Sequence, residues 1–144
     1  MTDPSPTLIL YPLFAMVLLV AIVLMRLRSM RFGAVRSGAM RAEFYRAYPE
    51  GGEPDALRVV SRHYVNLFEM PVLFYAGVIL VYVTRQVSWW LIGCAWLYVA
   101  LRYAHSWVHL TSNVVLVRFT LYFASAFVLL LIWATLFVQL VRTG

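Results

Sequence analysis

RHYVNLFEMPVLFYAGVILVYV, the stretch from Arg62 to Val83, begins with charged and amide side chains and ends as an uncharged apolar run. Arg62, Asn66 and Glu69 all fall in its first eight residues, and no charged residue follows Glu69. A charge inside a membrane costs about 2.5–3.5 kcal/mol on insertion scales, so such a residue is expected to face a partner or a wet cavity. The stretch therefore predicts a helix that enters a membrane while one of its faces is polar.

The composition of the whole chain is that of a membrane protein. Of 144 residues, 63% are hydrophobic and 12% are charged, whereas a soluble domain is nearer half apolar and a quarter charged. The single cysteine, Cys94, excludes an internal disulfide. Every positive charge is an arginine, a side chain that binds carboxylates or phosphates and stays charged when partly buried. We expect no nucleic-acid partner, because neither zinc-finger spacing nor a glycine-rich phosphate loop occurs.

Four segments are apolar over the roughly 20 residues that a membrane-spanning helix needs. We expect helices at about 7–27, 57–84, 88–110 and 117–142, separated by a first loop at about 28–56. The predicted fold class is therefore an all-α integral membrane domain, residues 1–144, built as a bundle of four transmembrane helices.

The distribution of arginines predicts the orientation of this bundle. The arginines between the first two spans are Arg28, Arg31, Arg36, Arg41, Arg46 and Arg58. The opposite side carries only Arg85 and Arg142. By the positive-inside rule the first loop faces the cytoplasm and both termini face outside.

Polar residues recur at helical spacing in the last three predicted helices. At about 100° per residue, three faces are polar: Arg58, Arg62, Asn66 and Glu69 on the second helix; Arg102, His105 and His109 on the third; Arg118, Tyr122 and Ser125 on the fourth. All three faces lie at the cytoplasmic ends of their helices. We therefore expect them to converge, with Glu69 forming an ion pair with Arg102 or Arg62.

Each of these residues also has a purely structural interpretation. The arginines of the second helix could be interfacial anchors, Asn66 could form an interhelical hydrogen bond, and a Glu69–Arg102 pair could serve stability alone. The two histidines could be packed core residues, and Tyr122 could belong to an interfacial aromatic belt. Convergence of three polar faces at one depth favours a binding site instead.

The residue types in these faces suit a small zwitterion with more than one carboxylate. Arginine binds carboxylates in bidentate fashion, and Glu69 can accept an ammonium group. We expect no metal site, because carboxylates are few and His105 with His109 lacks an obvious third ligand. No Ser/His/Asp or Cys/His arrangement suits covalent catalysis. The first loop offers four further acids that could approach the ligand: Glu43, Glu50, Glu53 and Asp55.

Two motifs resemble those of the MAPEG family, the membrane-associated proteins of eicosanoid and glutathione metabolism. RHYVNLFEMP, residues 62–71, resembles the family's second-helix motif, with Arg62, Asn66 and Glu69 at its spacings. RYAHSWVHLTSNVVLVRFTLY, residues 102–122, resembles a second signature of the family. Its matching positions are Arg102, His105, Arg118 and Tyr122. The resemblance covers nearly the whole chain.

The resemblance implies a homotrimer of four-helix bundles that binds glutathione, as co-substrate, between neighbouring subunits at the cytoplasmic side. The residues expected to bind glutathione are Arg62, Asn66, Glu69, Arg102, His105, His109 and Tyr122. Arg118 corresponds to the arginine that stabilises the glutathione thiolate, and it is the expected catalytic residue. A nearby guanidinium lowers the pKa of a thiol from about 8.5. A hydrophobic acceptor would arrive laterally from the membrane lipids.

Three positions depart from the family pattern. His109 stands where several members have a glutathione-contacting tyrosine, and Val65 where some have an arginine. Phe119 follows Arg118 where the prostaglandin synthases have a serine. These differences argue against a prostaglandin-type isomerase.

The function expected from the sequence is therefore a membrane-bound glutathione transferase or peroxidase acting on hydrophobic electrophiles, as in detoxification, in a bacterial inner membrane. The alternative is a non-catalytic lipid- or glutathione-binding scaffold of the same fold. A transporter is the least favoured interpretation, because the fourth helix is apolar outward of Ser125.

Overall fold

The computed structural model describes residues 4–47 and 52–143, and these contain helices and turns but no strand. The elements are η1 (Pro6–Ile9), α1 (Leu10–Arg36), α2 (Phe44–Ala47), α3 (Asp55–Asn66), α4 (Met70–Val83), α5 (Trp89–Leu110) and α6 (Val115–Thr143). The all-helical part of the predicted fold class is thus confirmed for the described residues.

Three segments of the described chain are long and apolar enough to cross a membrane. They are Pro6–Arg36, Asp55–Val83 and Val115–Thr143. The third predicted span corresponds to α5, which is not among them. Its tryptophans, together with Arg102, His105 and His109, lower its mean hydropathy.

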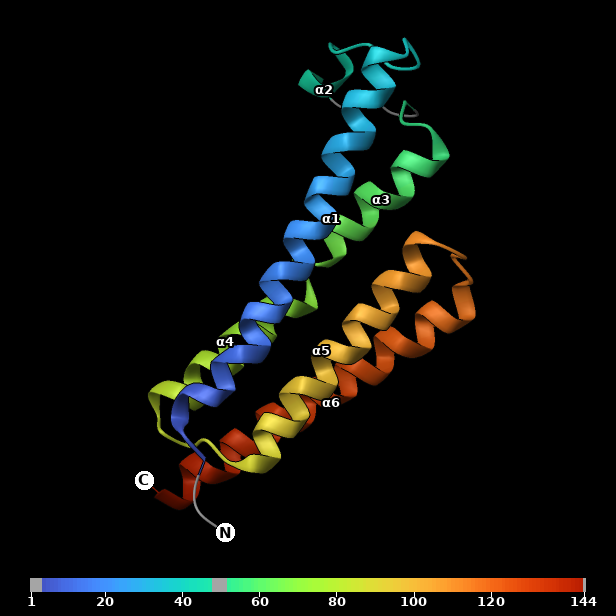
Figure 1. Cartoon of the computed structure of the whole chain (residues 1–144). Helices are drawn as coiled ribbons and strands as arrows, with labels where there is room; N and C mark the ends of the chain where they lie inside the picture. Colours follow the sequence, from blue (N-terminus) through green and yellow to red (C-terminus); the bar gives the residue numbers. More distant parts are fainter. Residues whose placement is uncertain (1–3, 48–51, 144) are drawn as a thin grey trace.

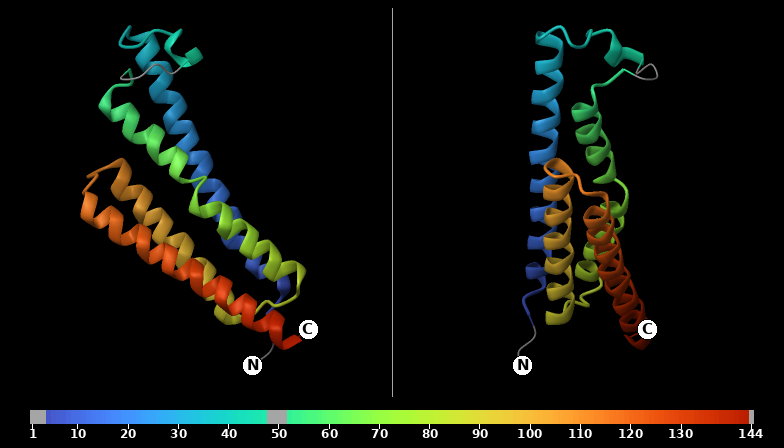
Figure 2. Two further views of the ribbon diagram at one scale, coloured as in Figure 1. Left: turned by 180° about the vertical axis from the view of Figure 1, so that it is seen from behind. Right: turned by 90° about the vertical axis from the view of Figure 1, so that its right-hand side faces the viewer.

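The helices pack as two pairs that diverge toward one end of the molecule (Figure 1). α5 lies along α6, and α1 runs beside α3 and α4. The beginning of α1 and the end of α6 lie at the same end of the bundle (Figure 2). The first-loop ends of α1 and α3 lie at the other end, where they extend beyond the turn between α5 and α6.

The predicted second helix, 57–84, is interrupted by a turn at Leu67–Glu69. Pro71 explains the break, because proline has no N–H to donate to the carbonyl four residues earlier and its ring clashes with that carbonyl. The Phe68 N–H instead donates to the Val65 carbonyl at 2.8 Å, the tighter bonding of a 3₁₀ turn. The apolar helix therefore begins anew directly after Glu69.

The first helix is longer than the sequence predicted. α1 continues to Arg36, whereas residue 27 was its predicted end. Its last turns are held by a small core in which Leu27 packs with Leu57 and Val60 of α3. Arginine is a good helix former, so a stretch that looks like a basic loop from its charge continues the helix.

An apolar core joins α1, α4, α5 and α6. Met16 and Val78 are fully buried within it, and the rings of Phe74 and Tyr98 stack with their centroids 4.4 Å apart. The outward faces are also apolar. Large side chains exposed there include Phe14, Leu130 and Phe137, at 63%, 64% and 68%. Extended apolar surfaces of this kind mark contacts with a membrane or with another protein.

Candidate functional site

A cavity of ≈ 840 Å³ lies where the first-loop ends of α1 and α3 meet α5 and α6. The predicted site residues that line it are Arg62, Asn66, Glu69, His105, His109, Arg118 and Tyr122. Its volume falls within the range of about 300–1,000 Å³ that is usual for ligand pockets. The three polar faces thus converge, as their helical spacing predicted.

Arg102 lies behind the wall of this cavity. Its side chain is fully buried, and its Nη2 donates to the side-chain oxygen of Asn66 at 2.7 Å. The amide nitrogen of Asn66 donates in turn to Glu69 Oε2 at 2.9 Å. The guanidinium carbon lies 5.5 Å from the centroid of the Tyr122 ring. Arg102 therefore acts on the cavity through Asn66, which it holds in a fixed orientation.

The predicted ion pair of Glu69 with Arg102 or Arg62 does not form. Within the described residues no nitrogen of either arginine lies within 4.0 Å of a Glu69 carboxylate oxygen. The turn before Pro71 places Glu69 at an exposed position, and the Asn66 amide bonds to Arg102 on one side and Glu69 on the other. The two charges are thus connected by a neutral group.

Arg118 is held by the turn between α5 and α6. Its Nη1 donates to Asn113 Oδ1 at 2.6 Å and to His109 Nε2 at 3.4 Å. Asn113 has a φ of 49°, a left-handed conformation in which asparagine is several-fold enriched. The turn therefore presents an amide oxygen that fixes a guanidinium at the cavity wall.

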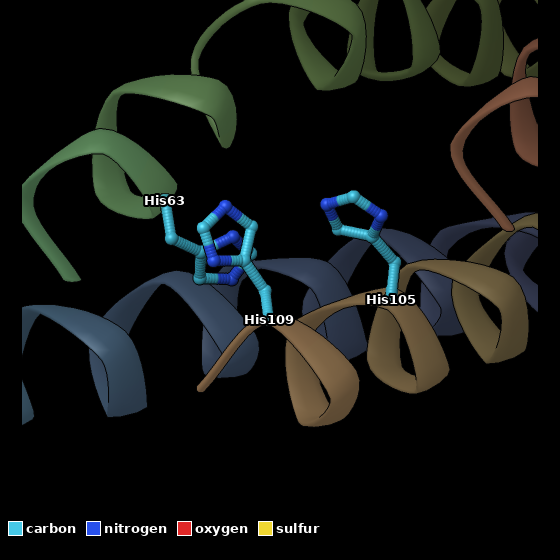
Figure 3. Close-up of side chains that lie close together, drawn as sticks. All are labelled: His63, His105 and His109. Carbon is cyan, nitrogen blue, oxygen red and sulfur yellow. The ribbon is translucent and has the colours of Figure 1, made fainter. Parts of the chain in front are cut away.

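Three imidazole rings meet beside this arginine. His63 of α3 lies against His109, and His105 lies one turn earlier on α5 (Figure 3). One ring nitrogen from each lies within 4.8 Å of the others. The expectation that His105 and His109 lack a third ligand is therefore wrong.

The charged lining of the cavity is mainly positive. Its charged residues are Arg31, Arg58, Arg62, Arg118, Glu53 and Glu69. Glu53, one of the four first-loop acids considered, bonds to Arg31 at 3.4 Å and to Ser61 at 2.8 Å. Asp55 pairs with Arg58, and Glu50 lies outside the described residues.

The model of the MAPEG family matches residues 9–138, which include both motifs and all the cavity residues named above. The chain belongs to the MAPEG family. Searches of curated proteins and of solved structures give no match. The MAPEG family includes glutathione transferases and related proteins, and its members generally use glutathione. The resemblance seen in the two motifs is thus confirmed at the level of the family.

Three residues that contact the lining of the cavity directly or through one another were not predicted from the sequence: His63, Ser106 and Asn113. His63 follows Arg62 directly, so it points about 100° away from the polar face of its helix. Its ring nitrogen bonds to Ser106 Oγ at 2.9 Å across the α3–α5 contact. The turn at Asn113 could have been predicted from the sequence, because an asparagine between two helices is typical of a turn that adopts positive φ.

Proposed function

We propose that this MAPEG chain is a membrane-bound glutathione transferase or peroxidase that acts on hydrophobic electrophiles. The observation that carries the proposal is one cavity that combines several guanidinium groups, an exposed carboxylate and an apolar flank. Glutathione offers two carboxylates, one ammonium group and a thiol. Each of these groups has a complementary partner in the cavity lining.

Recognition of the tripeptide would divide between the two ends of the cavity. Arg62 is exposed, and within the described residues it has no acidic partner within 4.0 Å, so it is available for a carboxylate of the ligand. Glu69 accepts the ammonium group. The remaining polar contacts come from Asn66, His105, His109 and Tyr122, and Arg102 orients Asn66.

Arg118 is assigned to the thiol. Its guanidinium stabilises the thiolate electrostatically, so that the nucleophilic form is present at neutral pH. In the transferase reaction the sulfur lone pair forms a carbon–sulfur bond, and the leaving group departs with its bonding electrons. In the peroxidase reaction a lipid hydroperoxide is reduced to the alcohol and water while two glutathione molecules are oxidised to the disulfide.

The acceptor substrate would approach along α6. Val115 and Phe119 line the cavity and are 65% and 57% exposed, and they continue an apolar outer face that would lie in the membrane.

We further propose that α5 crosses the membrane as a fourth span, that the chains form a homotrimer, and that the arginine-rich end faces the cytoplasm of a bacterial cell. A neighbouring chain in such a trimer would close the exposed side of the cavity.

The first test is titration of glutathione into the full chain purified in detergent, followed by calorimetry. Saturable binding of glutathione is expected. An analogue whose thiol is replaced by a methyl group should also bind, because the protein recognises the carboxylates of the ligand. Arg62→Gln should weaken the binding of both compounds. Absence of binding at millimolar glutathione would show that the cavity is not a glutathione-binding site.

The second test separates an enzyme from a scaffold. Turnover of glutathione with a chlorinated aromatic compound or a lipid hydroperoxide is expected for the wild-type chain. Binding of glutathione without turnover of either acceptor class would instead support the non-catalytic scaffold.

A further inference from the structure

All three histidines of the chain gather in one place, although His63 and His105 are 42 positions apart in the sequence. Their exposed fractions are 0% for His63, 3% for His105 and 8% for His109. The rings of His63 and His109 lie with centroids 4.7 Å apart, and each lies 5.7 Å from that of His105. Polar rings in such a buried position need partners for their nitrogens.

The hydrogen bonds determine which nitrogen of His63 is a donor. The Ser106 hydroxyl donates its proton to the Arg102 carbonyl at 2.8 Å, so its oxygen accepts from His63 Nε2, which lies 2.9 Å away. His63 Nδ1 is then the nitrogen with the lone pair, and it is buried without a hydrogen-bond partner. A neutral imidazole whose N–H is held by a hydrogen bond presents its other nitrogen, with its lone pair, to a metal ion.

His105 is oriented in the same way by a different group. Its Nδ1 lies 3.0 Å from the backbone carbonyl of Arg118, which can only accept, so Nδ1 carries the proton. Nε2 of His105 is therefore the lone-pair nitrogen, and it too is buried without a partner. Donation of one ring N–H to a carbonyl is the usual outer contact of a metal-binding histidine.

His109 supplies the third nitrogen with a lone pair. Its Nε2 accepts from Arg118 Nη1 at 3.4 Å, a long bond, whereas the same arginine nitrogen donates to Asn113 at 2.6 Å. If His109 Nε2 binds a metal ion instead, Arg118 therefore keeps its shorter hydrogen bond, to Asn113.

We propose that His63, His105 and His109 form a binding site for one zinc-type divalent transition-metal ion. Three imidazoles plus one open position is the ligand set of many catalytic zinc sites. Tetrahedral zinc with Zn–N bonds of about 2.0–2.1 Å needs donors about 3.4 Å apart. One ring nitrogen from each histidine lies within 4.8 Å of the others, so rotation of the rings would bring three ligating nitrogens to that spacing.

The open fourth position faces the cavity, because His105 and His109 line it and His63 does not. The three ligands are neutral, and the guanidinium of Arg118 lies beside them. An anionic fourth ligand, such as hydroxide, therefore strengthens binding by offsetting the charges of the ion and the arginine. Metal binding does not require glutathione, although His105 and His109 are shared with the proposed glutathione site, so the titration below is carried out without glutathione.

The test is a titration of Co²⁺ and Zn²⁺ into the full chain, purified without a histidine tag and stripped with chelator. One ion per chain is expected, with the intense visible absorption of tetrahedral Co²⁺. His63→Ala should abolish this signal, and Ser106→Ala should weaken the affinity about 10- to 100-fold. Arg118→Gln should strengthen it. Cys94→Ser is the matched control and should leave it unchanged, since it removes the single thiol.

A measurement on the wild-type chain guards against variants that fail to fold. X-ray absorption at the zinc edge should show three imidazole ligands with nitrogen at about 2.0–2.1 Å. Absence of saturable one-to-one binding, fewer than three imidazoles in the spectrum, or unchanged affinity in a folded His63→Ala chain would each overturn the proposal. The histidines would then be a packed, hydrogen-bonded cluster.

Discussion

Replacement of Asn66 by leucine tests whether this residue satisfies the buried guanidinium of Arg102. The substitution keeps the approximate size of the side chain and removes the oxygen that accepts from Arg102 Nη2 at 2.7 Å. Arg102 has no exposed surface, and the Asn66 backbone carbonyl, at 3.4 Å, is its one remaining acceptor among the described residues. A hydrogen bond to a charged group contributes about 1.5–3 kcal/mol, so Asn66→Leu should lower the free energy of unfolding by that amount.

The double variant makes the prediction quantitative. Replacement of both partners by apolar groups is much less costly than orphaning one of them, so Arg102→Met should recover most of the stability lost in Asn66→Leu. The coupling energy from the double-mutant cycle should be about 1.5–3 kcal/mol. Glu69→Gln is the matched control. It is exposed and still offers an oxygen to Asn66, so its effect should stay within about 0.5 kcal/mol.

The assay is reversible unfolding of the detergent-solubilised chain by increasing fractions of sodium dodecyl sulfate, followed by far-ultraviolet circular dichroism. Additivity of the two single substitutions within about 0.5 kcal/mol would refute the reasoning. So would wild-type stability of Asn66→Leu, because the arginine would then have another way to satisfy its donors.

Three further predictions concern the same cavity. Arg118→Gln should retain most of the glutathione affinity but raise the pKa of the bound thiol, which appears as lower thiolate absorbance at neutral pH. Asn113→Gly should lower that absorbance partly, because Arg118 loses its contact with Asn113 while glycine keeps the left-handed turn without strain. Asn113→Ala should lose the same contact, and the folded chain should in addition be about 1–2 kcal/mol less stable than wild type in thermal unfolding. Pro71→Ala should allow helical bonding through Leu67–Glu69, seen as slower amide hydrogen exchange at these residues.

Helical periodicity was sufficient to predict which polar residues share a helix face. Residues three and four apart share a helix face whatever the tertiary structure, so the polar faces containing Asn66, His105 and Tyr122 could be identified from spacing alone. Their convergence followed from the expectation that intramembrane polar groups find one another. The two motifs added the family, which the match over residues 9–138 confirms.

The errors came from interactions that spacing does not encode. The second helix was predicted to be continuous over 57–84, so the turn at Leu67–Glu69 that precedes Pro71 was missed. α1 extends past residue 27 because Leu27 packs on α3, a contact between segments far apart in sequence. His63 lay within the quoted motif but off its polar face, so its meeting with the pair on α5 depended on how the two helices pack.

The buried guanidinium of Arg102 explains how a residue outside the cavity can affect what binds inside it. Guanidinium carries five N–H donors, and Nε and Nη1 of Arg102 are buried without partners. Its bonds to Asn66 are to a neutral group, and among the described residues no acidic group lies within 4.0 Å of its charge. Such a charge destabilises the free chain and raises the positive potential of the cavity beside it. Arg102→Met should therefore make the unliganded chain more stable and bind glutathione more weakly, the opposing changes expected where stability is sacrificed for binding.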